Sequence, residues 1–179
     1  MREDGIEILY KDVVRKVSTT KQKIKQKEYL HKGKIPIIDQ GQVSIGGYTD
    51  DESKILDCNL PVIVFGDHTK VVKLINFKFA PGADGTKVLE PKEMVLPKFL
   101  SYVTQHLVLK IKDKGYARHY QYIEKEKFYL PSLTEQRIIV SKIEELFSEL
   151  DNGIENLNKA KEKLEIYRQA VLKKAFEGK

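Results

Sequence analysis

The segment from Ser132 to Phe176 has the sequence SLTEQRIIVSKIEELFSELDNGIENLNKAKEKLEIYRQAVLKKAF. Apolar residues recur in it every seven positions from Ile143 to Val171, and a smaller, less uniform set follows three positions after each of the first four. This heptad spacing keeps one apolar seam of a helix facing a partner helix. The predicted seam consists of Ile143, Leu146, Leu150, Leu157, Ala160, Leu164, Tyr167 and Val171.

Both ends of this helix are marked in the sequence. Ser132-Leu133-Thr134-Glu135 has the pattern of a capping box, and Gly178 is typical of a helix stop. A helix from Leu133 to Phe176 would be about 65 Å long, too long to lie buried on the rest of the chain. We therefore expect it to pair with another helix; the alternative is one amphipathic helix packed on its own domain. Gly153 interrupts the seam and indicates a close helix approach or a kink.

Length and composition fit one compact domain plus this helix. The chain has 179 residues, of which 41% are hydrophobic and 32% charged. No apolar run approaches the roughly eighteen residues that span a membrane, and residues 1–10 lack the apolar region of a signal peptide. A single cysteine, Cys58, excludes an intrachain disulfide and favours a reducing compartment. We expect a cytoplasmic protein that does not contact a membrane.

The charge is unevenly distributed along the chain. Residues 134–179 carry nine basic and nine acidic side chains, which leaves 23 basic and 17 acidic ones in the first 133 residues from totals of 32 and 26. The whole net charge of +6 therefore belongs to the part before the helix. A basic globular part on a neutral helix favours nucleic-acid binding by the globular part.

Short β segments broken by turn residues fill the first part of the chain. Strands are predicted at Ile35 to Ile38, Leu60 to Phe65 and Val71 to Phe79, and a helix at Pro97 to Leu109. The sequence thus predicts an α+β fold, with a recognition domain at 1–131 and a coiled-coil helix at 132–179.

Several polar and basic segments of this domain are candidate DNA contacts. The lysines from Lys21 to Lys34 form either a solvated loop or a phosphate-contacting arm, and both interpretations stay open. Three further segments carry side chain types that read base edges. The candidate residues so far are Lys21, Lys23, Lys25, Gln40, Gln42, Ser44, His68, Thr69, Lys70, Arg118, His119 and Tyr120.

The sequence supports a catalytic or metal site less well than it supports the DNA contacts. The sequence lacks a Walker-type phosphate loop, and its four histidines and Cys58 lack metal-ligand spacing. Asp84, Glu90 and Lys92 do follow the Asp…Glu-x-Lys spacing of metal-dependent nucleases. Such a spacing arises easily in a chain this rich in charge, and we expect Pro91 to disfavour the strand that this site requires.

The sequence resembles the specificity subunits of type I restriction-modification systems. Three parts of the long helix carry the resemblance: Leu130 to Gln136, Ile143 to Phe147, and Tyr167 to Gly178. Upstream, Ile35-Pro36, the FGDHTK segment, residues 82–87 and the loop from Gly115 to Tyr120 resemble one class of target recognition domain in that family. Lys87, in the third of these segments, joins the candidate DNA contacts.

The resemblance implies a non-catalytic subunit that reads one half of a split site in double-stranded DNA. Methyltransferase subunits, which carry S-adenosylmethionine, would dock on the helices, and restriction or translocase subunits using ATP and Mg would join them. A full specificity subunit has two recognition domains and two such helices, whereas this chain has one of each. It is either a natural half-subunit or a shortened one.

The heptad pattern and the resemblance together predict a homodimer with antiparallel helices and an interrupted palindromic target. Two other functions remain possible from the sequence. One is a stand-alone dimeric coiled-coil DNA-binding regulator, and the other is a nuclease built on Asp84, Glu90 and Lys92.

Overall fold

The structure is a computed structural model. It describes residues 5–82, 85–111 and 118–178 of the chain. It divides into two compact units, Met1–Arg137 and Ile138–Lys179. Only the first turn of the long helix α3 (Leu133–Glu177) belongs to the first unit. An α+β fold of small sheets and one long helix confirms the predicted fold class. The predicted functional division at residue 131 stays a prediction.

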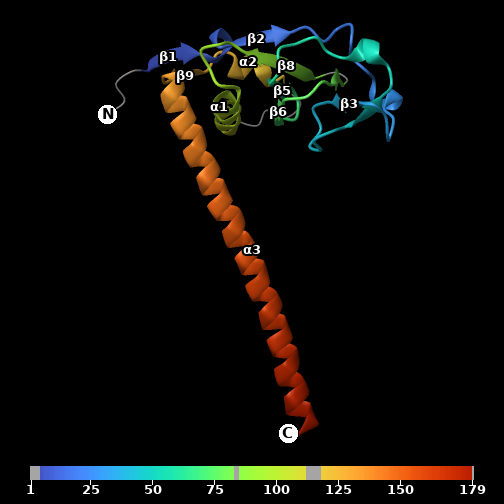
Figure 1. Cartoon of the computed structure of the whole chain (residues 1–179), viewed down its shortest axis with the longest axis vertical. Coiled ribbons are helices and arrows are strands. Elements are labelled where there is room, and N and C mark those ends of the chain that lie inside the picture. The colour runs from blue at the N-terminus through green and yellow to red at the C-terminus, as the bar shows by residue number, and fades with distance from the viewer. Residues whose placement is uncertain (1–4, 83–84, 112–117, 179) are drawn as a thin grey trace. The chain divides into compact units, whose positions relative to one another are not determined.

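A four-stranded antiparallel sheet forms the centre of the first unit (Figure 1). Its strands run in the order β2 (Val14–Val17), β8 (Thr86–Pro91), β5 (Val62–Gly66) and β6 (Val72–Ile75). All five residues of β5 are buried, because β8 and β6 flank the strand and helix α1 (Pro97–Lys110) packs against β5 and β6. The buried strand and the helix predicted from the sequence are therefore confirmed.

Two smaller sheets complete the first unit. β4 (Gly47–Thr49), β3 (Ile35–Ile38) and β7 (Ala80–Pro81) form one of them, in which β3 and β7 are parallel. β1 (Ile6–Leu9) pairs with β9 (Lys127–Leu130) in the other. Helix α2 (Tyr120–Ile123) and the 3₁₀ turns Tyr10–Asp12, Gln26–Glu28 and Glu52–Lys54 connect these elements.

The predicted strand from Val71 to Phe79 is wrong beyond Ile75. Residues 76–78 are exposed, and the chain then crosses to the other sheet, where Ala80 pairs with Ile37. Phe79 is buried in the hydrophobic cluster that the central sheet shares with its neighbours. Alternating apolar residues on both sides of this crossing read as one strand, because the pattern does not show which sheet a residue joins.

Buried Gln136 fixes the first turn of α3 within the first unit. Its side chain is fully buried. Its Oε1 accepts a hydrogen bond from the backbone N–H of Leu96 at 2.7 Å, and its Nε2 donates to the carbonyl oxygens of Met94 at 3.1 Å and Pro131 at 2.9 Å. The glutamine of the Leu130 to Gln136 motif is thus a clamp between the helix start and the segment before α1.

The predicted helix boundaries are confirmed to within a residue. Ser132 Oγ accepts the backbone N–H of Glu135 at 3.3 Å, as a capping box requires, and Gly178 adopts a φ of +67° just after the last helical residue. The helix continues through Gly153, and an added Cβ there would meet nothing within 4 Å. No helix among the described residues is both long enough and apolar enough to cross a membrane.

We predict that Gln136→Ala lowers the free energy of unfolding by about 1–3 kcal/mol or more, because it leaves buried backbone groups of residues 94–96 and 131 without partners. Urea denaturation of the purified chain measures this. Gln169→Ala, which changes an exposed glutamine of the same helix, should stay within about 0.5 kcal/mol of the unmodified protein. Equal unfolding midpoints for both variants would show that the clamp does not stabilise the fold.

Candidate functional site

Segments that are far apart in the sequence meet at Asp67, in the turn between β5 and β6. The backbone N–H of Asp67 donates to Gly85 O at 2.7 Å, and its carbonyl oxygen accepts the backbone N–H of His119 at 2.8 Å. Its side chain accepts the backbone N–H of Tyr120 at 2.9 Å and lies 3.3 Å from Lys87 Nζ. Asp67 thus joins the predicted FGDHTK, 82–87 and 115–120 segments at one point.

The Asp67 carboxylate is buried, with 4% of the side chain exposed, and its ion pair with Lys87 is partly screened because Lys87 is 26% exposed. A buried charge is tolerated only when it is paired and hydrogen-bonded, and both oxygens of this carboxylate have a partner. The residue belongs to the FGDHTK segment, but no role was predicted for it. The available signal was an aspartate directly after a fully apolar strand.

His119 and Tyr120, two of the predicted base-reading residues, are buried in the core. His119 Nδ1 lies 2.9 Å from the carbonyl oxygen of Asp67, which can only accept, so Nδ1 carries the proton. The Tyr120 ring packs on Phe65 at 6.1 Å, and burial raises the pKa of Tyr120 to about 12. Both side chains hold the segment that begins at exposed Arg118, and base contact by either one stays a prediction.

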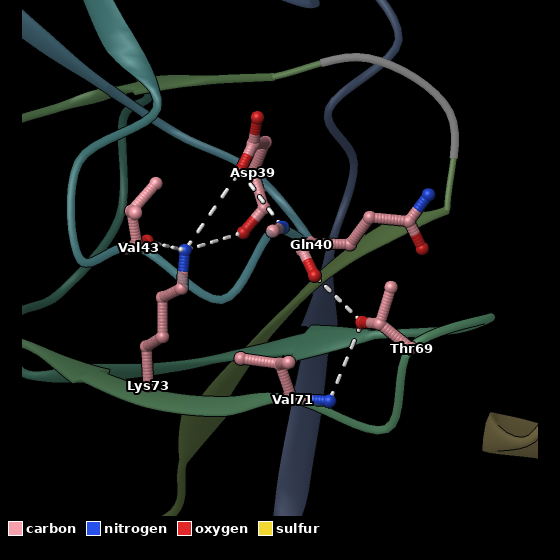
Figure 2. Close-up of polar contacts among 7 residues, drawn as sticks. Asp39, Gln40, Val43, Thr69, Val71 and Lys73 are labelled. Carbon is pink, nitrogen blue, oxygen red and sulfur yellow. Dashed lines mark hydrogen bonds and ion pairs between the residues drawn. The ribbon is translucent and has the colours of Figure 1, made fainter.

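A second connection ties the β5–β6 turn to the loop after β3 (Figure 2). Thr69 Oγ1 donates to Gln40 O at 2.6 Å and accepts the backbone N–H of Val71 at 3.4 Å, and Gln40 Oε1 accepts the backbone N–H of His68 at 3.3 Å. Gly66 permits this close approach, because a Cβ there would collide with Thr69 Oγ1 and the Gln40 side chain. Gln40 and Thr69 therefore both hold loops together.

Lys73 in β6 anchors the same loop, as Figure 2 shows. Its Nζ donates to the carbonyl oxygens of Asp39 at 2.9 Å and Val43 at 2.7 Å, and it lies 3.8 Å from Asp39 Oδ1. Burial lowers the pKa of Lys73, while the nearby Asp39 carboxylate acts in the opposite direction. This lysine was not predicted as a functional residue, since an alternating strand with one basic residue reads as a solvent-facing position.

Four of the predicted DNA contacts surround one hollow of about 630 Å³. They are exposed Gln42, Ser44 and Thr69 and half-buried Lys70. Lys70 has a φ of 61°, the left-handed conformation, at the tip of the turn. The structure thus brings together residues from two predicted segments that are 25 or more positions apart.

Lys21, Lys23, Lys25, His68 and Lys87 do not line this hollow. Lys21 and Lys25 are exposed, and Lys23 is half buried. Lys23 and Lys87 both line a second, smaller hollow where β2 ends and β8 begins. His68 is half buried beside Gln40.

The residues of the nuclease pattern form no metal site in the part of the chain that the structure describes, where no cluster of three or more His, Cys, Asp or Glu could hold an ion. Asp84 lies outside the described residues. Although burial acts in the opposite direction, hydrogen bonds from Arg15 and Asn59 keep the pKa of Glu90 below its usual value. The expectation about Pro91 was wrong: it lies within β8, opposite Val14.

We predict that Asp67→Ala lowers the free energy of unfolding by about 1–3 kcal/mol or more, because Tyr120 N–H and the Lys87 ammonium lose their buried partner. Asp67→Asn should cost less, since an amide oxygen can still accept from Tyr120. The exposed Asp57→Ala change is the matched control and should have an effect within about 0.5 kcal/mol. If Asp67→Ala is as stable as Asp57→Ala in urea, Asp67 does not hold these segments.

Solved structures of other proteins share this fold. No curated protein matches the chain. A chain from a study of complex assembly and conformational transition of the type I R-M system superposes with a TM-score of 0.76 at 18% identity, over 98% of this chain and 46% of that one. The HsdS subunit from Thermoanaerobacter tengcongensis gives a TM-score of 0.63 at 14% identity, over 84% of this chain and 39% of that one. The S subunit of the type I restriction-modification system from M. genitalium gives a TM-score of 0.61 at 14% identity, over 83% of this chain and 40% of that one.

The chain therefore spans less than half the length of each of these structures. At such identities the likeness shows the fold alone. The sequence model of the type I restriction modification DNA specificity domain, in contrast, matches residues 9–165, most of the chain. The chain belongs to the type I restriction modification DNA specificity domain family.

Proposed function

We propose that this chain is a DNA sequence-specificity half-subunit of a type I restriction-modification complex, in which each copy reads one half of a bipartite target. Family membership supports this function over a stand-alone regulator or a nuclease. The observation that carries it is the hollow bordered by Gln42, Ser44, Thr69 and Lys70. The side chains of Gln42, Ser44 and Lys70 are of types that donate to or accept from base edges and phosphates, whereas Thr69 holds its turn to Gln40.

The loops that carry these residues are held by internal bonds, which favours specific recognition. Lys73 binds two carbonyl oxygens of the segment 39–43, and Thr69 binds Gln40. A loop that is already held in place loses less conformational entropy when it binds than a free loop does. Gln42 and Ser44 therefore stand on a braced loop while their own side chains remain exposed.

A second copy of the chain would supply the recognition unit for the other half of the DNA target. The seam residues Leu150, Leu157 and Leu164 of α3 are each more than half exposed in the single chain. A row of exposed leucines at heptad spacing is typical of a helix that pairs. The chain also spans less than half of the specificity structures that share its fold. An antiparallel homodimer would place two identical recognition units in twofold symmetry and give an interrupted palindromic target.

Catalysis in such a complex would come from other subunits. We propose that methyltransferase subunits carrying S-adenosylmethionine dock on this dimer, and that restriction or translocase subunits using ATP and Mg join where restriction occurs. The first of the similar structures concerns complex assembly of a type I system, which is consistent with this arrangement. The cytoplasmic location predicted from the sequence fits a protein that acts on DNA and stays a prediction.

We predict that Arg118→Ala weakens specific DNA binding by about 1–3 kcal/mol, if its exposed guanidinium makes a bidentate base contact. Fluorescence anisotropy with the target duplex and a scrambled duplex measures the specificity ratio. Arg137→Ala, which removes another exposed arginine of the first unit, should leave that ratio unchanged. An unaltered ratio for Arg118→Ala would remove this residue from base reading.

We predict that Leu157→Lys converts the dimer to a monomer, because a charge in mid-seam would be buried without a partner. Light scattering should give twice 20.7 kDa for the unmodified chain and 20.7 kDa for the variant. Asn158→Lys adds the same charge one position outside the seam and should remain dimeric. A persisting Leu157→Lys dimer would show that the seam is not the interface.

A further inference from the structure

The hollow where β2 ends and β8 begins has a built-in set of anion-binding groups. Val17 and Val88 are the last paired residues of the two strands, and beyond this pair β2 and β8 no longer form a ladder. The space between them has a volume of about 340 Å³. The described residues that line it are Lys16, Val17, Ser18, Thr19, Thr20, Lys23, Thr86 and Lys87.

Ammonium and hydroxyl groups dominate this lining. Three lysines and four hydroxyl side chains contribute to it, and none of the lining residues described is acidic. The Asp67 carboxylate pairs with Lys87 and offsets the positive charge of that lysine. Ammonium and hydroxyl donors are the side chain groups that bind phosphate oxygens most often.

Thr86, which lines the hollow, provides an independent observation that favours a ligand site there. The residue is 3% exposed, and its Oγ1 is buried without a hydrogen-bond partner among the described residues. A buried hydroxyl without a hydrogen-bond partner destabilises the folded state. In contrast, the buried hydroxyl of Thr104 lies 2.8 Å from the Tyr10 hydroxyl and donates to Leu100 O at 2.6 Å.

The lysines of the hollow are held in place by the surrounding fold. Lys16 Nζ lies 5.4 Å from the centre of the Tyr120 ring, and Asp67 holds Lys87. The backbone N–H of Lys23 donates to Thr19 O at 3.0 Å, in a turn that brings this lysine back to the strand end. These interactions restrain the ammonium groups of Lys16 and Lys87 and the backbone of Lys23, which lowers the entropic cost of binding.

We propose that this hollow binds a backbone phosphate of double-stranded DNA, with Thr86 donating its hydroxyl hydrogen and Lys16, Lys23 and Lys87 neutralising the charge. The proposal rests on the proposed DNA-binding function and gives it a sequence-independent anchor. Asp67 links this anchor to the β5–β6 turn, which carries Thr69 and Lys70. A phosphate bound at this point would fix the register of the recognition loops on the duplex.

The decisive variant is Thr86→Val, which keeps the shape of the side chain and removes the hydroxyl. We expect its thermal midpoint to equal or exceed that of the unmodified chain, because the removed hydroxyl has no partner to leave behind. Its affinity for a non-specific 20-base-pair duplex, measured by anisotropy with the full chain, should fall about tenfold. Thr104→Val is the matched control: it should lower the thermal midpoint and leave DNA affinity unchanged at temperatures where it is folded.

Lys16→Gln provides a second measurement. The slope of log K against log salt concentration should become less steep by about 0.9, because the variant neutralises one phosphate fewer. If the unmodified chain binds DNA but Thr86→Val binds equally well, the phosphate site is wrong and the proposed DNA-binding function stands. An unchanged slope for Lys16→Gln would likewise overturn the role of that lysine.

A third arm separates DNA from free phosphate as the source of the anion. Inorganic phosphate should raise the thermal midpoint of the unmodified chain little at concentrations where the duplex saturates it. If no duplex binds the unmodified chain, both the proposed function and this DNA assignment fail. If phosphate alone then raises the midpoint of the unmodified chain but not of Thr86→Val, the hollow takes a phosphate that is not part of DNA.

Discussion

The recognition unit depends on one buried carboxylate, that of Asp67. Its backbone and side chain bind Gly85, His119, Tyr120 and Lys87, which come from separate parts of the chain. A buried charge that is deprived of its partners is strongly unfavourable, so these segments can keep their arrangement only together. The loops proposed to read DNA are therefore not independent insertions on a sheet but parts of one polar assembly.

The proposed site contains two groups of side chains: those that hold the loops together and those that are exposed and available to contact DNA. Gln40, Thr69 and Lys73 direct their polar groups to neighbouring loops, whereas Gln42, Ser44 and Arg118 are exposed to solvent. This division resembles that of other recognition surfaces, where inner polar groups hold the outer ones in position. The Thr86 hollow adds an anchor for the backbone of the nucleic acid beside the same turn.

The long helix was predictable because its signals are local. Heptad spacing, a capping serine and a final glycine indicated its limits to within one residue, and a periodic apolar face indicated α1. The motif that carries the family resemblance also contains Gln136, whose clamp on residues 94–96 no local pattern could show. Its burial follows from contacts with residues 40 positions away.

The features that the sequence did not reveal likewise depend on long-range contacts. His119 and Tyr120 stand in a polar segment and read as surface residues, but Asp67, more than 50 positions earlier, holds them in the core. The strand ending at Ile75 and the place of Pro91 inside β8 depend on which sheet each residue joins. Lys73 reads as a solvent-facing lysine, and only the position of the 39–43 segment turns it into an anchor.

The central claim is that each copy reads one half-site and that two copies read a symmetric target. The most direct measurement is selection of bound duplexes from a random DNA pool by the purified full chain, followed by sequencing. We expect enrichment of an interrupted palindrome, in which two identical half-sites in inverted orientation are separated by a spacer of fixed length. Enrichment of a single unrepeated motif, or of no sequence at all, would contradict it.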